Sequence, residues 1–294
     1  MEKTIKIPQA VHSTFDGFDA LLNIVNHYID SKEDDRIILD FQANTWFDAN
    51  LLPVVYAIVE FGRLKNVTSS YLNQHNCKLH KLLIRNGFAK CCFKLEHQPL
   101  QQETTIPFKV FRASDTYGFS AYMDAELLRY FPNMDSSIKR AISTYIQELF
   151  GNAQIHGICS QVYTCGQYYF KNHKMDFTIV NLGKTIGDNV VEFLLESNFD
   201  LPDNNIAWAV QPNHSTKRNF SGGIGLTLMR DFIRFNSGKF QIVSGNEFWE
   251  LNGSSECTRS FKIPFPGTII NIEIDQNDKN IYKDVRESIG ELFF

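Results

Sequence analysis

A glutamate and an asparagine one helical turn apart could carry out nucleotide chemistry in this chain. Glu148 and Asn152 are spaced i and i+4, so on a helix they share one face, which His156 continues. An amide oxygen is a hard ligand of the kind that Mg²⁺ accepts, and a carboxylate can orient or deprotonate an attacking hydroxyl or water. An ordinary polar helix face has the same spacing, so this pair alone leaves both interpretations open.

A glycine-rich loop could hold phosphate groups. Gly222, Gly223 and Gly225 open a stretch that we expect to be helical as far as Phe235. Glycines let backbone N–H groups approach phosphate oxygens, and a helix N-terminus favours an anion. No Gly-Lys-Ser/Thr follows, so the loop is not of the Walker type, and it lacks the strand and spacing of a dinucleotide fingerprint. A flexible loop end is the alternative.

Two strand ends carry polar residues beside glycines. Asn181 and Gly183 follow a buried strand, and Thr268 follows Gly267 at the start of another strand. A polar side chain there can meet the edge of a base, while glycine permits close backbone approach. Each feature taken separately is also an ordinary strand end.

Together, in this order and spacing, the four elements resemble the N, G1, G2 and G3 boxes of the GHKL (Bergerat-fold) ATPase superfamily. The resemblance covers about residues 106–275. It implies ATP and Mg²⁺ as cofactors, with Glu148 as general base and Asn152 as magnesium ligand. The nucleotide-binding residues that it implies are Asn152, Asn181, Gly183, Thr185, Ile186, Thr216, Lys217, Gly222, Gly223, Ile224, Gly225, Leu226 and Thr268.

The resemblance also assigns individual residues to the parts of the nucleotide that they would contact. Gly183 would lie behind the adenine, and the connection Gly187–Ser221 would be the ATP lid, with Thr216, Lys217 and Arg218 near the terminal phosphate. Asn181 stands where the family has an aspartate that accepts from the adenine amino group. An amide accepts without charge and can also donate, so the choice between ATP and GTP stays open.

The N-terminal part resembles a STAS-type domain, the class that includes anti-sigma-factor antagonists. The matching features are a strand over Arg36–Phe41, the segment Trp46–Leu52 opening a helix, and a helix ending at Asn86. Phosphorylated members have a serine after the loop aspartate, but here Ala49 follows Asp48 and has no hydroxyl. Phosphorylation of this loop by the attached domain is therefore not expected. We interpret Asp48 as a helix N-cap.

These elements define an α/β chain of two domains. The polar segment Gln98–Thr105 separates a STAS-like domain over 1–100 from a GHKL-type ATP-binding domain over 106–294, the latter a sandwich with a mixed sheet covered by helices on one face. Periodicity predicts helices at Leu21–Ile29, Ala49–Phe61, Cys77–Asn86, Ser136–Gln154, Ile224–Phe235 and Ile281–Phe294. It predicts strands at Asn66–Leu72, Pro107–Phe111, Gln161–Phe170, Met175–Val180, Lys239–Val243, Ser260–Ile263 and Thr268–Ile274.

Composition and net charge bear on the partners and the cellular location of the protein. The net charge of −4 gives no sign of a nucleic-acid footprint, and no apolar run reaches the roughly 18 residues of a membrane span. We therefore expect a cytoplasmic protein whose six cysteines are reduced structural thiols.

Three functions fit the sequence. The first is slow ATP hydrolysis as a regulatory switch, with Glu148 as base. The second is a serine/threonine protein kinase of the anti-sigma type acting on a protein partner. The third is a non-hydrolysing module in which bound nucleotide gates a partner surface. The partner stays unidentified, and a homodimer through the STAS-like domain is left open.

Overall fold

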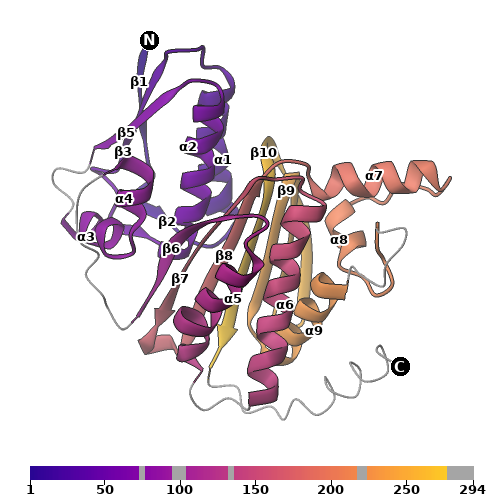
Figure 1. The fold of residues 1–294 in the computed structure, drawn as a ribbon. Coiled ribbons are helices and arrows are strands. Elements are labelled where there is room, and N and C mark those ends of the chain that lie inside the picture. The colour runs from indigo at the N-terminus through magenta and orange to yellow at the C-terminus, as the bar shows by residue number, and fades with distance from the viewer. Residues whose placement is uncertain (73–76, 95–103, 132–135, 217–223, 277–294) are drawn as a thin grey trace.

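The computed structural model describes residues 1–72, 77–94, 104–131, 136–216 and 224–276. Two sheets organise these residues: a three-stranded sheet in the N-terminal unit and a five-stranded sheet in the C-terminal unit, with a short two-stranded pairing between β2 and β4 (Figure 1). The α/β class expected from the sequence is confirmed.

The N-terminal unit is a parallel α/β layer. Its strands run in the order β1-β3-β5 and both ladders are parallel, so each strand needs a crossover before the next. Helices α1 and α2 provide those crossovers, and Thr14 caps α1 by accepting from the Gly17 N–H. The elements are β1 (Glu2–Lys6), β2 (Ala10–Val11), α1 (Phe15–Ile29), β3 (Arg36–Asp40), β4 (Trp46–Phe47), η1 (Ala49–Leu51), α2 (Leu52–Leu64), β5 (Thr68–Leu72), α3 (Cys77–Arg85) and α4 (Phe88–Phe93).

The C-terminal unit is built on a sheet with the strand order β6-β7-β8-β10-β9. Every ladder described in it is antiparallel, so the expectation of a mixed sheet is wrong; successive strands are joined by short turns at β7–β8 and β9–β10. The strands are β6 (Thr105–Arg112), β7 (Gln161–Tyr169), β8 (Lys174–Leu182), β9 (Lys239–Asn252) and β10 (Ser255–Asp275).

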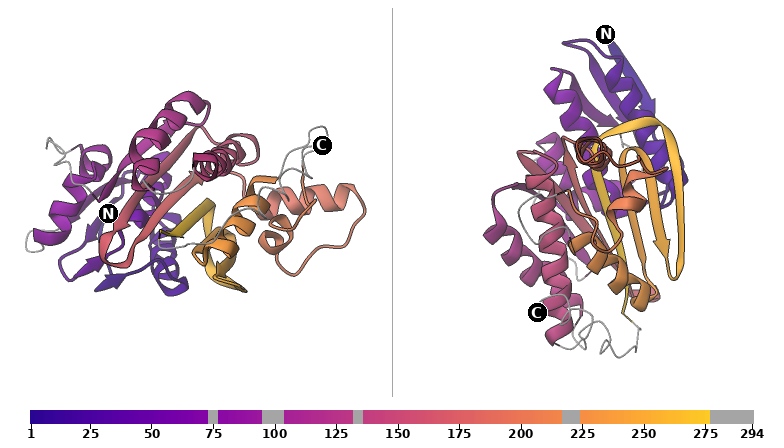
Figure 2. Two further views of the ribbon diagram at one scale, coloured as in Figure 1. Left: turned by 90° about the horizontal axis from the view of Figure 1, so that it is seen from below. Right: turned by 90° about the vertical axis from the view of Figure 1, so that its right-hand side faces the viewer.

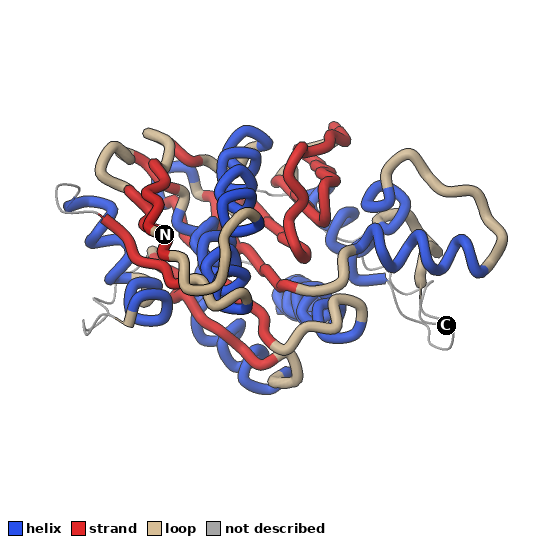
Figure 3. The backbone as a smooth tube through the Cα atoms, turned by 90° about the horizontal axis from the view of Figure 1, so that it is seen from above, coloured by secondary structure: helices blue, strands red, loops and turns tan. Residues whose placement is uncertain are grey.

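Helices of the C-terminal unit cover one face of this sheet. The long helix α6 packs beside α9, and both lie over the strands with α5 (Figures 1 and 2). Their elements are α5 (Thr116–Tyr122), η2 (Met123–Leu127), η3 (Leu128–Tyr130), α6 (Ser136–Ile155), η4 (Phe170–Asn172), α7 (Ile186–Glu196), α8 (Asn205–Ala209) and α9 (Ile224–Asn236). Figure 3 shows α7 and α8 extending beyond the end of the sheet.

The opposite face of the five-stranded sheet is covered by the N-terminal unit. Helix α2 packs on β7 and β8, where the rings of Tyr56 and Tyr163 lie 4.9 Å apart, and α1 packs on β10. Strand alternation separates the two cores: Ile179 joins the core under α6, while its neighbour Val180 joins the core under α2. The helices of the C-terminal unit therefore cover one face, as the sequence predicts, and helices of the N-terminal unit cover the other.

The largest departure from the predicted elements lies after β8. The sequence shows no clear periodicity over Gly187–Ser221, yet the structure forms α7 and α8 there. The predicted helix Ile281–Phe294 and most of the predicted boundary Gln98–Thr105 lie outside the described residues.

Two expectations from composition concern membranes and thiols. Within the described ranges, no helix is long and apolar enough to cross a bilayer. The described cysteine side chains, those of Cys91, Cys92, Cys159, Cys165 and Cys257, are free thiols. Burial raises the pKa of the Cys165 thiol to about 12, which keeps it protonated and unreactive.

Candidate functional site

An open cavity of about 770 Å³ lies on the helix-covered face of the five-stranded sheet. Strands β8 and β10 form its floor, and α6, α7, the segment around α8, and α9 form its walls. The lining residues are Leu149, Asn152, Ala153, His156, Gly157, Ile179, Asn181, Lys184, Ile186, Asn189, Val190, Trp208, Ala209, His214, Ser215, Thr216, Leu226, Thr268 and Ile270.

The floor of the cavity pairs polar with apolar residues on adjacent strands. Asn181 of β8 lies directly opposite Thr268 of β10, and Ile179 and Ile270 lie further along the same strands on the same face. Asn181 is only 4% exposed, and its amide Nδ2 has no hydrogen-bond partner among the described residues. An unpaired buried donor costs about 1–3 kcal/mol, so this amide would gain from any acceptor that entered the cavity.

Thr268 belongs to a hydroxyl relay beneath the cavity. Its Oγ1 lies 2.7 Å from Oγ of Ser244, which also accepts a hydrogen bond of 2.8 Å from the backbone N–H of Ile186. The relay joins β9, β10 and the start of α7. The relay thereby ties the floor strand β10 to its neighbour β9 and to the wall helix α7.

Asn152 of helix α6 and His156, directly after its end, both belong to the wall, four residues apart as in the sequence motif. The Asn152 carbonyl accepts from the N–H groups of His156 and Gly157, which ends the helix beside the cavity. The His156 Nδ1 lies 3.3 Å from the Thr216 hydroxyl. This contact links the end of α6 to the segment that follows α8.

Glycine is required at position 183 by a close backbone approach. The Lys184 N–H donates to the Gly157 carbonyl at 2.8 Å, so the turn after β8 lies against the end of α6. Gly183 has φ of +139°, and a Cβ there would lie 2.1 Å from the Gly157 oxygen. Any side chain at 183 would therefore push α6 and β8 apart at the rim of the cavity.

Helices α7 and α8 close the remaining sides through two N-terminal caps. Thr185 and Asp188 form a capping box at the start of α7, so Thr185 acts in the wall and does not line the cavity. The Glu247 carboxylate accepts from the backbone N–H groups of Asn205 and Ile206 at the start of α8, at 2.9 and 3.1 Å. These caps fix where Ile186 and Trp208 face the cavity.

Glu148 lies beside the cavity and does not line it. Its side chain is exposed on α6, one turn before Asn152. A Cβ at Gly225 would lie 2.6 Å from the Glu148 Cβ, so the first turn of α9 packs directly against this part of α6. Glycine at 225 therefore allows the start of α9 to approach Glu148.

The other predicted site residues divide into two groups. Asn152, Asn181, Ile186, Thr216, Leu226 and Thr268 line one cavity. Lys217, Arg218, Gly222 and Gly223 lie outside the described residues, as does the side chain of Ile224, whose backbone begins α9. The roles assigned to these residues by resemblance stay predictions.

Sequence reasoning missed part of the wall. Trp208 and His214 line the cavity and stack with ring centroids 4.4 Å apart, and the Asn189 amide donates to the His156 carbonyl at 3.0 Å. The available signals were helix caps: Thr185 and Asp188 at the start of α7, and Asn204, which caps α8. Helix α7 also carries an apolar stripe, Ile186, Val190 and Leu194, that the sequence reasoning overlooked, whereas the five residues of α8 are too few to show a period.

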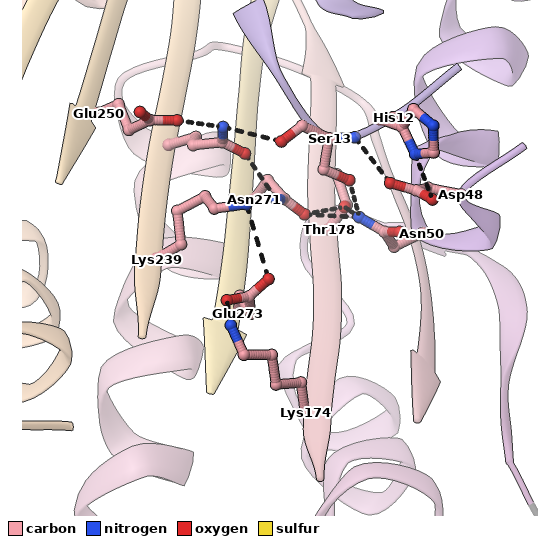
Figure 4. Close-up of polar contacts among 11 residues, drawn as sticks. His12, Ser13, Asp48, Asn50, Lys174, Thr178, Lys239, Glu250, Asn271 and Glu273 are labelled. Carbon is pink, nitrogen blue, oxygen red and sulfur yellow. Dashed lines mark hydrogen bonds and ion pairs between the residues drawn. The ribbon is translucent and has the colours of Figure 1, made fainter. Parts of the chain in front are cut away.

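A buried polar network joins the N-terminal unit to the back of the same strands (Figure 4). The Asn50 amide, fully buried, donates to Asn271 Oδ1 at 2.8 Å and to Ser13 Oγ at 2.9 Å. Thr178 also donates to Asn271 Oδ1, at 2.7 Å, and Asn271 donates to Gln241. The network therefore fixes the docking of the N-terminal unit on β8, β9 and β10.

Asp48 takes part in this contact in a way that the sequence did not predict. It occupies the N-cap position of η1, but its side chain makes no cap hydrogen bond. Its carboxylate instead accepts from the Ser13 N–H and from Trp46 Nε1, both at 2.7 Å. The N-cap interpretation is wrong, because Ser13, which follows β2, and Trp46 of β4 supply the donors that the Asp48 carboxylate accepts from. Ala49, beside it, is buried at 2% exposure.

Comparison with protein-family models finds no matching family, and comparison with curated proteins finds no matching relative.

Proposed function

We propose that this chain is a GHKL-type protein that binds Mg-ATP in the cavity between α6, α7, α8, α9 and the floor of β8 and β10. One observation carries the proposal: Asn152, Asn181 and Thr268, selected from three separate motifs, line a single cavity. These three residues are spread over more than one hundred positions of the chain, and chance alone would leave them far apart in the fold. Their convergence supports a shared ligand.

The base is recognised at the floor. An asparagine amide offers a donor and an acceptor side by side, which matches the adjacent acceptor and donor on the edge of a purine. The unpaired Nδ2 of Asn181 supplies the donor, and the apolar residues Ile179 and Ile270 pack under the ring. Adenine and guanine both offer such an edge, so the nucleotide preference has to be measured.

The phosphates lie toward the start of α9. A helix of this length presents free N–H groups and a positive dipole end at its N-terminus, which favours phosphate. Magnesium in nucleotide sites is usually held by substrate phosphates together with one or two protein oxygens. The Asn152 amide oxygen, on the wall of the cavity, is the protein ligand that fits this role.

Slow hydrolysis with Glu148 as general base is the catalytic part of the proposal. Glu148 packs against Gly225 at the start of α9, close to where the phosphates are proposed to lie. Its position outside the cavity lining favours the second candidate, a non-hydrolysing switch in which bound nucleotide reorganises the α7–α8 wall.

Calorimetry with ATP, ADP and GTP, with and without Mg²⁺, tests the proposal. We expect Asn152→Ala to lose the magnesium-dependent part of the affinity, and the exposed helical control Asn23→Ala to bind as the unmodified protein does. The proposal is wrong if no nucleotide binds, or if Asn152→Ala and Asn23→Ala are indistinguishable.

Phosphate release then separates the two candidates. Slow release that is lost in Glu148→Ala, with nucleotide affinity retained, supports hydrolysis. Tight binding with release equal to that of Glu148→Ala supports the non-hydrolysing switch.

A further inference from the structure

A second open cavity, of about 960 Å³, lies where the N-terminal unit meets the sheet on its other face. Trp46 and Asp48 of the N-terminal unit form one side. Asp176 and Glu273, from β8 and β10, form the floor, and Phe170 lies at the turn after β7. This cavity is separate from the first because Asp176 and Thr178 point to the N-terminal unit, whereas Ile179 points to α6.

Asp176 is a buried carboxylate whose hydrogen bonding is incomplete. It is only 6% exposed, and its Oδ1 has no hydrogen-bond partner in the part of the chain that the structure describes. It lies directly opposite Glu273 on the neighbouring strand, an arrangement of like charges that is unfavourable by itself. A buried acceptor of this kind is costly unless another group donates to it.

The other carboxylates of the cavity have partners (Figure 4). Glu273 is paired with Lys174 at 2.6 Å and with Lys239 at 3.6 Å. Asp48 accepts from the Ser13 N–H and from Trp46, and His12 lies 3.5 Å from it. Both of these lysines are therefore ion-paired with Glu273. Lys171, on the exposed turn η4, lies at the mouth.

Aromatic rings stand exposed at the mouth of the cavity. Trp46 is 51% exposed and Phe170 is 69% exposed, although burying large rings is normally favourable. Aromatic faces attract cations, and recognition of organic ammonium ions commonly combines such rings with a carboxylate. We propose that this cavity binds a small organic ammonium ion, with Asp176 as its counter-ion and the rings of Trp46 and Phe170 against its alkyl groups.

The electrostatics of the floor disfavour the ionised form of Asp176 while the cavity holds no cation. Burial raises the pKa of Asp176 well above its usual range, and the charges of Glu273 and Asp48 raise it further, against Lys239 and Lys174, which lower it. A bound cation supplies the missing opposite charge. It also provides the missing partner for Oδ1, directly when it carries N–H groups or through an adjacent hydroxyl when it does not.

Titration of the full chain with choline tests the proposal, and 3,3-dimethyl-1-butanol, its neutral analogue of the same shape, is the matched control ligand. We expect choline to bind with a millimolar or lower Kd, measured by calorimetry and ligand-observed NMR at constant ionic strength, and the neutral analogue not to bind. Asp176→Asn should weaken choline binding at least about tenfold, and Phe170→Leu about threefold.

The exposed carboxylate Asp30 follows the far end of α1 and provides the control variant. Asp30→Asn should bind choline as the unmodified protein does. The proposal is overturned if choline does not bind at tens of millimolar, if the neutral analogue binds equally well, or if Asp176→Asn and Asp30→Asn give the same affinity. Thermal melts confirm that each variant is folded.

Discussion

The two faces of the five-stranded sheet differ in how the amide donors of their buried asparagines are used. On the face covered by the N-terminal unit, Asn50 Nδ2 donates to Asn271 and Ser13, and Asn271 Nδ2 donates to Gln241, although Asn50 Oδ1 has no partner among the described residues. On the face covered by α6 and α9, Asn181 is nearly as buried, yet its Nδ2 has no partner among the described residues. The asparagine donor is therefore used inside the protein on one face and, among the described residues, left without an acceptor beside the cavity on the other.

The physical reason is that a buried amide must find its partners inside the protein or in a bound molecule. A paired network contributes to stability and fixes how two units dock. An unpaired amide beside an open cavity lowers stability slightly and creates a place for recognition. Substitutions on the two faces should therefore differ in which property they change.

The largest effect on stability should come from Asn50→Ala. This change removes donors to Ser13 and Asn271 inside a sealed contact, and should lower the free energy of unfolding by about 3 kcal/mol. Urea denaturation measures it, with exposed Asn23→Ala as control. A loss below about 1 kcal/mol would contradict the view that this network fixes the docking of the N-terminal unit.

Gly183→Ala should come next, with a loss of about 2 kcal/mol and weaker nucleotide binding. The new Cβ would meet the Gly157 carbonyl at the cavity rim. Gly253→Ala is the matched control, because Gly253 also has positive φ but has nothing within 4 Å of a Cβ. Equal losses in the two variants would show that backbone conformation, and not the close approach, governs position 183.

Asn181→Ala should change stability by less than about 1 kcal/mol, because its Nδ2 has no partner to lose among the described residues. Nucleotide affinity should nevertheless fall about tenfold. Urea denaturation and calorimetry on the same preparation measure the two quantities. A stability loss equal to that of Asn50→Ala would remove the proposed difference between the faces.

The last effect is confined to pH dependence and concerns Asp176. Its pKa is raised in the folded protein by burial and by Glu273 and Asp48. In the unfolded chain an aspartate ionises near pH 3.9. Between that pH and the raised pKa of folded Asp176, the folded state binds more protons, so the free energy of unfolding falls as pH rises; above the raised pKa it falls no further. Asp176→Asn lacks this titration, so it should gain stability over the unmodified protein as pH rises, and show no such gain below about pH 4.

Urea denaturation of both proteins at several pH values from 4 to 7 measures the difference between their free energies of unfolding. The titration of all other groups cancels in this difference. A stability difference that does not depend on pH would show that the pKa of Asp176 is not raised in the folded protein.

The sequence predicted most secondary structure because periodic apolar residues are a local signal. The strands β7 and β8 and the helices α6 and α9 were predicted with only small shifts at their ends. Short helices such as α8 carry too few apolar repeats, and their existence depends on a cap supplied from β9 by Glu247. That contact spans a distance in sequence which no local pattern contains.

The sequence by itself determined the α/β class, the long elements, and which motif residues could do nucleotide chemistry. Tertiary structure alone decided that Asn152, Asn181 and Thr268 share one cavity while Glu148 stands beside it, and that the N-terminal unit seals the back of the sheet. It also decided that Asp48 bonds to Ser13 and that Asp176 Oδ1 finds no partner in the described part of the chain. Residue type sets what a side chain can bind, whereas strand register and the docking of units set which partner it reaches.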